Sequence, residues 1–219
     1  MRAMKKIFVV VLFLLVATVA QAADRATVVL VGGAGSDTTH MEYLVKNIPN
    51  AINIVPDRLW PFSDAAADTW RKIQESDVAV DGKLILIGHS FGGLISRRVA
   101  AEHPEKVIAV ITISSPSGGF WACPKWIFRP GDEESNVPLY VIAVYKEGLE
   151  RWFFRGPNDG TVDVVSMLDT GREAADSVVL AGLEHMEVLR SKTVADIINH
   201  WIEPFKGDAS QVQTAMVSP

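Results

Sequence analysis

One short segment of the sequence presents a serine in a setting suited to nucleophilic chemistry. The residues Gly88-His89-Ser90-Phe91-Gly92 fit the pattern G-x-S-x-G, with an apolar run before them and a helical pattern after them. On a tight strand-to-helix turn the serine hydroxyl points out of the sheet, and the two glycines leave room for the turn. The first N–H groups of the helix favour a developing oxyanion. We therefore predict that Ser90 is a nucleophile; the alternative is a serine in an ordinary glycine-bordered turn.

A serine hydroxyl needs a base within hydrogen-bond distance to react at neutral pH, and the chain has five histidines. Four have positions typical of other roles: His40 on the polar side of a predicted helix, His89 inside the turn itself, His103 at a helix end before a proline, and His200 in the last helix. His185 lies in a loop that follows a late strand. By elimination, His185 is the predicted base.

The third member of such a site is a carboxylate that orients the imidazole and stabilises its charged form. Asp159 lies among glycines and a proline in a loop that follows the predicted strand 139–145. Its competitor Asp163 enters an apolar segment and is expected to point elsewhere, while Asp169 and Glu173 lie farther along a polar stretch. Asp159 is therefore the predicted acid. The chain order serine, acid, histidine is that of α/β hydrolases and differs from the orders of two other serine-protease folds.

The same chemistry requires two N–H donors for the oxyanion. The residue after the nucleophile, Phe91, is expected to give one of them. The other should come from the loop Gly32-Gly33-Ala34-Gly35-Ser36, where glycine lets the backbone approach a substrate closely. This run is not a phosphate loop, because it has neither G-x-G-x-x-G nor a following Gly-Lys-Ser.

Apolar strands and amphipathic helices alternate along the chain and would position these loops. Almost wholly apolar strands that alternate with helices indicate a parallel sheet covered on both faces. We predict one α/β domain, a doubly wound and mostly parallel sheet with helices on both faces. Ligands bind to such sheets at the carboxyl ends of the strands, where the loops above lie. The predicted strands are 27–31, 51–55, 83–88, 107–113, 139–145 and 178–180, and the predicted helices are 37–48, 65–75, 94–102 and 188–201.

Length, charge and the amino-terminal segment indicate the number of domains, the class of partner and the localisation. The 219 residues suit one domain, and a formal net charge of −5 disfavours nucleic-acid binding. A basic start, an apolar run and an Ala-x-Ala ending predict that residues 1–22 are a cleaved signal peptide, which implies a secreted or periplasmic protein. The domain is then 23–206, with a flexible tail at 207–219. The single cysteine, Cys123, cannot form an internal disulfide, and its aromatic neighbours favour burial.

With these motifs the sequence resembles the α/β-hydrolase superfamily, specifically its small bacterial lipases and esterases, from Val28 to about Trp201. Gly88 to Leu94 is similar to the family's elbow G-H-S-x-G-G-L. Val31 to Gly35 is similar to its His-Gly-x-Gly loop, with Gly32 in place of the histidine. The match implies that the Ala34 N–H is the second oxyanion donor.

Three further segments resemble parts of the same family. Thr112 to Gly119 is similar to the lipase segment Thr-Pro-His-x-Gly, with Ser117 where histidine is common. Asn158 to Val162 resembles the acid loop, and Glu184-His185 resembles the histidine loop. The resemblance thus implies the same three catalytic residues as the analysis above.

Aromatic residues concentrate in the connections near the same edge of the predicted sheet. Trp121 and Trp152 are the predicted substrate-binding residues, since aromatic side chains in loops favour an apolar wall for an acyl chain. Segments 118–137 and 147–156 could form a short flap over Ser90; the alternative is that these aromatic side chains belong to the core.

We therefore expect a monomeric serine hydrolase of carboxylic esters that acts on small-molecule or lipid esters, with contact to a lipid interface as an option. The chemistry requires no cofactor and no metal. The same triad could serve an amidase, a thioesterase or a peptidase. From another class, the chain could be a non-catalytic binding member of the fold.

Overall fold

The computed structural model describes residues 26–76, 82–119, 130–132, 134–149, 152 and 154–205. These residues form alternating strands and helices. In chain order the elements are β1 (Thr27–Val31), α2 (Glu42–Asn47), β2 (Ala51–Ile54), α3 (Phe62–Glu75), β3 (Leu84–His89), α4 (Phe91–Glu102), β4 (Val107–Ile113), β5 (Leu139–Tyr145), α5 (Val164–Leu168), β6 (Asp176–Ala181), the 3₁₀ turn η2 (Glu187–Arg190), α6 (Lys192–Ile202) and η3 (Glu203–Phe205).

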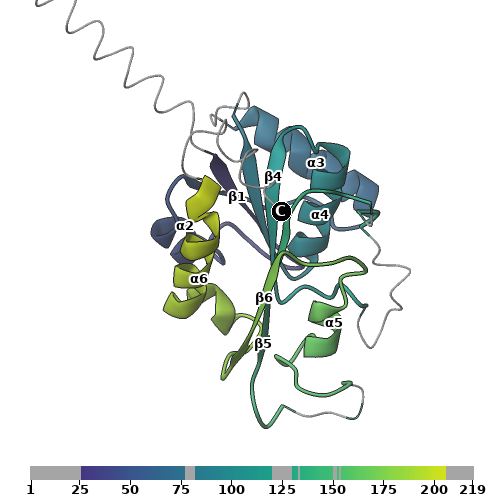
Figure 1. The fold of residues 1–219 in the computed structure, drawn as a ribbon, viewed down its shortest axis with the longest axis vertical. Helices are drawn as coiled ribbons and strands as arrows, with labels where there is room; N and C mark the ends of the chain where they lie inside the picture. Colours follow the sequence, from purple (N-terminus) through teal and green to yellow (C-terminus); the bar gives the residue numbers. More distant parts are fainter. Residues whose placement is uncertain are drawn as a thin grey trace, which may run out of the picture.

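The strands form one six-stranded sheet in the order β2-β1-β3-β4-β5-β6 (Figure 1), and every neighbouring pair is parallel. The register pairs Val31 with Gly88, and then Gly88 with Thr112, so β1, β3 and β4 end at the same level. This confirms the predicted doubly wound parallel sheet with helices on both faces.

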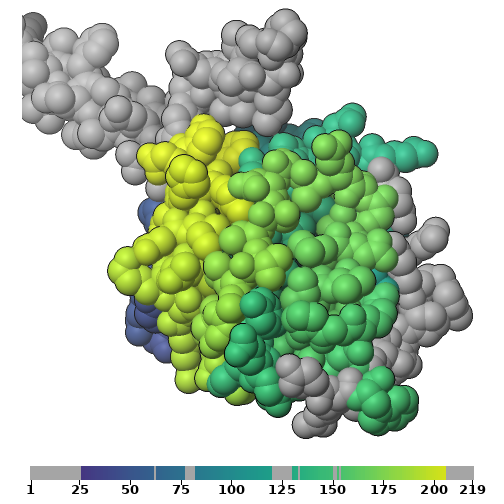
Figure 2. Space-filling view, turned by 60° about the horizontal axis from the view of Figure 1, so that its bottom comes forward, coloured from purple at the N-terminus to yellow at the C-terminus, as the bar shows by residue number. Residues whose placement is uncertain are grey.

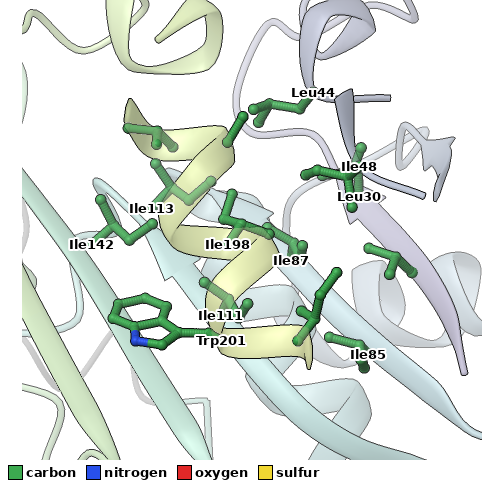
Figure 3. Packing of buried hydrophobic residues seen from close by; sticks show 14 of the residues in the cluster. Leu30, Leu44, Ile48, Ile85, Ile87, Ile111, Ile113, Ile142, Ile198 and Trp201 are labelled. Carbon is green, nitrogen blue, oxygen red and sulfur yellow. The ribbon is translucent and has the colours of Figure 1, made fainter. Parts of the chain in front are cut away.

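The strands are apolar because helices cover both faces of the sheet. Val28 and Leu30 face α2 and α6, whereas Val29 and Val31 face α3 and α4, so successive side chains enter two separate cores. In Figure 3 the side chains of Ile198 and Trp201 project from α6 onto the sheet. β3 lies between β1 and β4, and all six of its residues are buried.

The helices differ from the prediction at several places. α3 and α4 begin three residues earlier than predicted, and the predicted helix 188–201 is divided into η2 and α6. The predicted helix 37–48 begins only at Glu42, because the Asp37 carboxylate accepts hydrogen bonds from the N–H groups of Thr39 (2.7 Å) and His40 (3.2 Å) and holds residues 37–40 in a turn. The short helix α5 was not expected. Its five residues give too little periodicity to predict, and its first turn depends on the Asp163 side chain, which accepts a hydrogen bond from the Ser166 N–H.

Several predictions from the sequence concern residues outside the described ranges. They are the signal peptide 1–22, the tail 207–219, the environment of Cys123 and the substrate-binding role of Trp121. Among the described residues, no helix has the length and apolar composition needed to cross a membrane.

The packing of α6 makes a testable prediction about stability. Ile198 is completely buried against the sheet, so Ile198→Ala should lower the free energy of unfolding by about 2–5 kcal/mol in urea denaturation. Asp196→Ala on the exposed side of the same helix removes only a solvent-exposed ion pair with Lys192 and should change it by no more than about 0.5 kcal/mol. Equal effects of the two substitutions would contradict the assignment of the buried face.

Candidate active site

The order of the strands places a topological switch point between β1 and β3. The chain leaves β1 toward β2 on one side and leaves β3 toward β4 on the other, with α2 and α4 on opposite faces (Figure 1). At such a switch point the loops after the two neighbouring strands diverge and leave room for a ligand. These loops are the glycine-rich segment 32–36 and the turn at Ser90.

Ser90 lies between the last residue of β3 and the first residue of α4, in a strained backbone conformation. Its φ of 55° and ψ of −127° are rare for a residue with a side chain. The turn is narrow, because a Cβ on Gly88 or Gly92 would collide with backbone atoms of Gly92 or Val31 respectively. The Ser90 side chain does not cap the helix that it precedes. The strand, the turn and the helix thus form the predicted elbow.

The glycine-rich loop after β1 packs directly against this elbow. A Cβ placed on Gly33 would lie 2.7 Å from the His89 carbonyl oxygen, 2.8 Å from the Ser90 Cβ and 3.4 Å from the Phe91 nitrogen. Ala34 follows in an exposed turn that the Ser36 N–H closes by donating to the Gly33 carbonyl at 3.2 Å. The glycine that precedes Ala34 therefore lies beside both Ser90 and the Phe91 nitrogen, the two neighbouring parts of the predicted oxyanion site.

Gly32 stands where the resemblance implies a histidine, and a side chain there would require Ser36 to shift. A Cβ at Gly32 would lie 2.8 Å from the Cβ of Ser36 and 3.6 Å from a methyl group of Val55. The loop is held by its backbone, since the Gly32 N–H donates to the Ile54 carbonyl at 3.1 Å.

Asp159 and His185 lie in contact, although they follow different strands. His185 Nδ1 lies 2.6 Å from Asp159 Oδ2, and the His185 N–H donates to the Asp159 carbonyl at 2.9 Å. In Figure 2 the segments that follow β5 and β6, in green and yellow-green, lie side by side. Because an ionised carboxylate can only accept, Nδ1 carries the proton and Nε2 is left as a basic nitrogen.

The Asp159 side chain has a fixed orientation. It is 1% exposed, and its second oxygen, Oδ1, accepts hydrogen bonds from the N–H groups of Thr161 (2.9 Å) and Val162 (2.7 Å). The buried Asn158 amide braces the same loop by donating to the carbonyls of Leu149 (3.2 Å) and Gly156 (3.3 Å). The motif Asn-Asp-Gly marks a turn in the sequence, but which carbonyls the amide reaches depends on the fold.

His89 contacts His185, a contact that sequence reasoning did not anticipate. The buried His89 Nε2 lies 2.9 Å from the His185 carbonyl oxygen, and the centroids of the two rings are 4.6 Å apart. Burial, together with the nearby His185, lowers the pKa of His89 to about 3, so this ring is neutral at ordinary pH. Since His89 directly precedes Ser90, the contact brings the residue His185 beside the elbow.

The competing residues make other contacts. Asp163 caps α5 and pairs with the Arg155 guanidinium, with 3.3 Å between Nη2 and Oδ1. His40 accepts a hydrogen bond from the Asp37 N–H, His103 stacks on Trp70, and His200 is exposed on α6. Asp159 and His185 are thus the acid and the histidine that the structure brings together.

Of the two predicted substrate-binding residues, Trp152 is described and Trp121 is not. The Trp152 side chain is 94% exposed and lies in the connection between β5 and α5. Within the described ranges, no group of three or more His, Cys, Asp or Glu side chains is arranged to hold a metal ion.

A buried ion-pair network secures the helix that begins after Ser90. The Arg97 guanidinium, on α4, donates to both carboxylate oxygens of Asp132 at 2.8 and 2.7 Å and to the Thr170 carbonyl at 2.6 Å. Arg172 donates to the same carboxylate at 3.1 Å. The network ties α4 to the segments before β5 and after α5.

Comparisons with known proteins agree with this architecture. A family model described as alpha/beta hydrolase fold matches residues 31–157, more than half of the chain. Among solved structures, the chain is similar to a Bacillus licheniformis lipase, BlEst2 in its mature form, with a TM-score of 0.55 and 16% identity; the match covers 83% of this chain and 91% of that one.

Two further structures give similar values. One is the naproxen esterase (carboxylesterase NP) of Bacillus subtilis, with a TM-score of 0.56, 12% identity and 84% of each chain covered. The other is Est1E from Butyrivibrio proteoclasticus, with a TM-score of 0.57, 11% identity, and 82% of this chain and 88% of that chain covered. At these identities the likeness shows the fold alone.

The low pKa of the buried His89 predicts how stability depends on pH. In the unfolded chain this ring binds a proton below about pH 6.5, whereas in the folded protein it does so only near pH 3. Between these values the unfolded state holds the extra proton, so stability falls as the pH falls, by about 1 kcal/mol per pH unit for this group. The free energy of unfolding, measured by urea denaturation between pH 6 and pH 4, should fall with pH more steeply in the wild type than in His89→Gln, which lacks this group. Parallel profiles would contradict the buried neutral ring.

Proposed function

The chain belongs to the α/β-hydrolase family, and from this premise we propose that it is a serine hydrolase that cleaves carboxylic esters. The observation that carries the proposal is the hydrogen bond between the buried Asp159 and His185, beside the elbow that holds Ser90. An acid, a histidine and a serine in these relations can activate an alcohol as a nucleophile. The similar structures include a lipase and an esterase, which supports the same class of reaction.

In the proposed mechanism, His185 Nε2 approaches Ser90 Oγ to hydrogen-bond distance and removes its proton as the oxygen attacks the ester carbonyl. The N–H groups of Phe91 and Ala34 bind the oxyanion. His185 then donates its proton to the leaving alcohol, and an acyl-enzyme forms on Ser90. Water, activated by the same imidazole, releases the acid and restores the serine.

The distribution of exposed apolar side chains supports an apolar acyl group in the substrate. Among the described residues, three of the six large exposed apolar side chains, Trp60, Trp152 and Met186, lie in the connections after β2, β5 and β6. The other three lie on α5 and β6: Val165, Leu168 and Val179. Met186, 44% exposed, directly follows the proposed base. Loops that follow parallel strands open at the edge of the sheet where Ser90 lies. We propose that Trp152 and Trp121 contribute to the acyl-binding surface, and that lipid esters are among the substrates.

The test of this function compares the wild type with Ser90→Ala on p-nitrophenyl esters of increasing chain length. Loss of the nucleophile should lower kcat/KM by about 10³–10⁶-fold and abolish labelling by a fluorophosphonate probe. A parallel panel of anilides and thioesters distinguishes an esterase from an amidase or a thioesterase. Ester hydrolysis that survives in Ser90→Ala would overturn the proposal, and a wild type that does not react with the probe would favour a non-catalytic protein.

The two aspartates near the base provide a matched pair of variants. Asp159→Asn removes the charge that orients His185 and should lower kcat by about 10²–10⁴-fold. Asp163→Asn keeps a residue that can cap α5 and should leave kcat within about threefold. The reverse order of the two effects, measured on one short-chain ester, would show that Asp163 is the acid.

We also propose that residues 1–22 direct export to the periplasm or the medium and are then removed. Expression of the full chain in a bacterial host should give an exported protein whose amino terminus, measured by mass spectrometry, is Ala23. A substitution of Ala22 by a bulky residue should block this cleavage, because signal peptidase accepts small residues there. An exported protein that retains Met1 would contradict the prediction.

A further inference from the structure

We propose that His89 is a positioning residue: its ring N–H holds the main chain of His185 and thereby sets the place of the catalytic imidazole relative to Ser90. The inference rests on the proposed function, since it deepens the role of a residue in the same site. His89 is the last residue of β3 and is joined directly to Ser90, so whatever it holds is fixed relative to the nucleophile.

The hydrogen bonds of His185 show why a second anchor is needed. β6, which leads to His185, is the edge strand of the sheet and lies three strands from β3. Asp159 holds the histidine on one side, through its carboxylate at 2.6 Å and its carbonyl at 2.9 Å. His89 Nε2 holds the other side, at 2.9 Å from the His185 carbonyl oxygen. The contacts with Asp159 connect His185 only to the loop that carries Asp159. The contact with His89 connects His185 to the elbow.

The chemistry of the His89 ring suits this role. A carbonyl oxygen can only accept, so Nε2 of the neutral ring carries the proton and donates it. A lysine or arginine could also donate, but its permanent charge would oppose the positive charge that His185 acquires during the reaction. Burial and the adjacent His185 keep the pKa of His89 far below that of an ordinary histidine. The ring therefore supplies a donor without a competing charge, and it lies beside the His185 imidazole, tilted by 46° with 4.6 Å between the ring centroids.

Two substitutions separate the hydrogen bond from the bulk of the side chain. His89→Leu keeps much of the volume and removes the donor; we expect kcat on p-nitrophenyl acetate to fall by about 10–100-fold with KM within about twofold, because a displaced base affects the chemical step more than binding. His89→Gln places an amide N–H near the position of Nε2 and should restore kcat to within about threefold of the wild type. If His89→Leu does not fold, His89→Asn replaces it, since its shorter amide cannot reach the carbonyl.

A control variant accounts for the loss of a buried hydrogen bond as such. Thr69 on α3 is completely buried and donates to the Ala65 carbonyl at 2.8 Å, so Thr69→Val removes one buried bond and should leave kcat unchanged. Unchanged kcat in His89→Leu, or an equal loss in His89→Gln and His89→Leu, would overturn the positioning role while leaving the esterase proposal intact. Loss of all ester hydrolysis in the wild type would instead overturn the proposed function.

A second readout does not depend on activity. The Nδ1–H proton of His185, hydrogen-bonded to Asp159, should give a downfield NMR resonance in the wild type and in His89→Gln. In His89→Leu this resonance should shift or broaden, because the imidazole is no longer held from both sides. The same sharp resonance in His89→Leu would contradict the inference even if the protein hydrolysed no ester.

Discussion

The position of His185 depends on three hydrogen bonds that connect it to two other loops. The residue follows the edge strand β6, whereas Ser90 follows the central strand β3. Its ring contacts the Asp159 carboxylate, and its carbonyl oxygen is bound by His89. Together these loops bury the Asp159 carboxylate, which is stable there because both oxygens accept hydrogen bonds. Without that burial the imidazole would have several orientations in place of one.

Parallel strands make this convergence possible. All six strands end at one edge of the sheet, so the loops after β1, β3, β5 and β6 share a surface although they span more than 150 residues of sequence. The strained backbone of Ser90 persists because β3 is buried on both faces and because Gly33, Gly88 and Gly92 let the neighbouring backbone close around the turn. The energy of packing two cores against the sheet thus maintains a conformation that the turn by itself would not adopt.

The strands and the loops of the site could be predicted from the sequence because their signals are local. Apolar runs such as 107–113 gave the buried strands, and Gly-His-Ser-Phe-Gly gave the elbow. Local signals were weaker where a side chain competes with the helix, as Asp37 does before α2, or where a helix is as short as α5. The contact between His89 and His185 could not be predicted, since it joins residues 96 positions apart. It depends on how the loop after β6 reaches β3, which lies three positions away in the sheet. In the sequence each residue is a separate candidate base; their contact with each other is a property of the tertiary structure.

Gly32 stands in place of the histidine that the resemblance implies, and the loop that contains it is held in a different way. A histidine at this position would support the oxyanion loop through its side chain. Here the first glycine lies against Ser36, and the turn from Gly33 to Ser36 closes on itself, while the Gly32 N–H bonds to β2. A Cβ at Gly32 would meet the Ser36 side chain, so a histidine here would require the loop to shift, and the present loop is supported by its own backbone. Because Gly33 touches both His89 and Ser90, this support extends to the elbow, and a change of loop conformation would also shift the residue that holds His185. The loop 32–36, Ser90 and His185, for which we propose the roles of oxyanion loop, nucleophile and base, are therefore connected through His89.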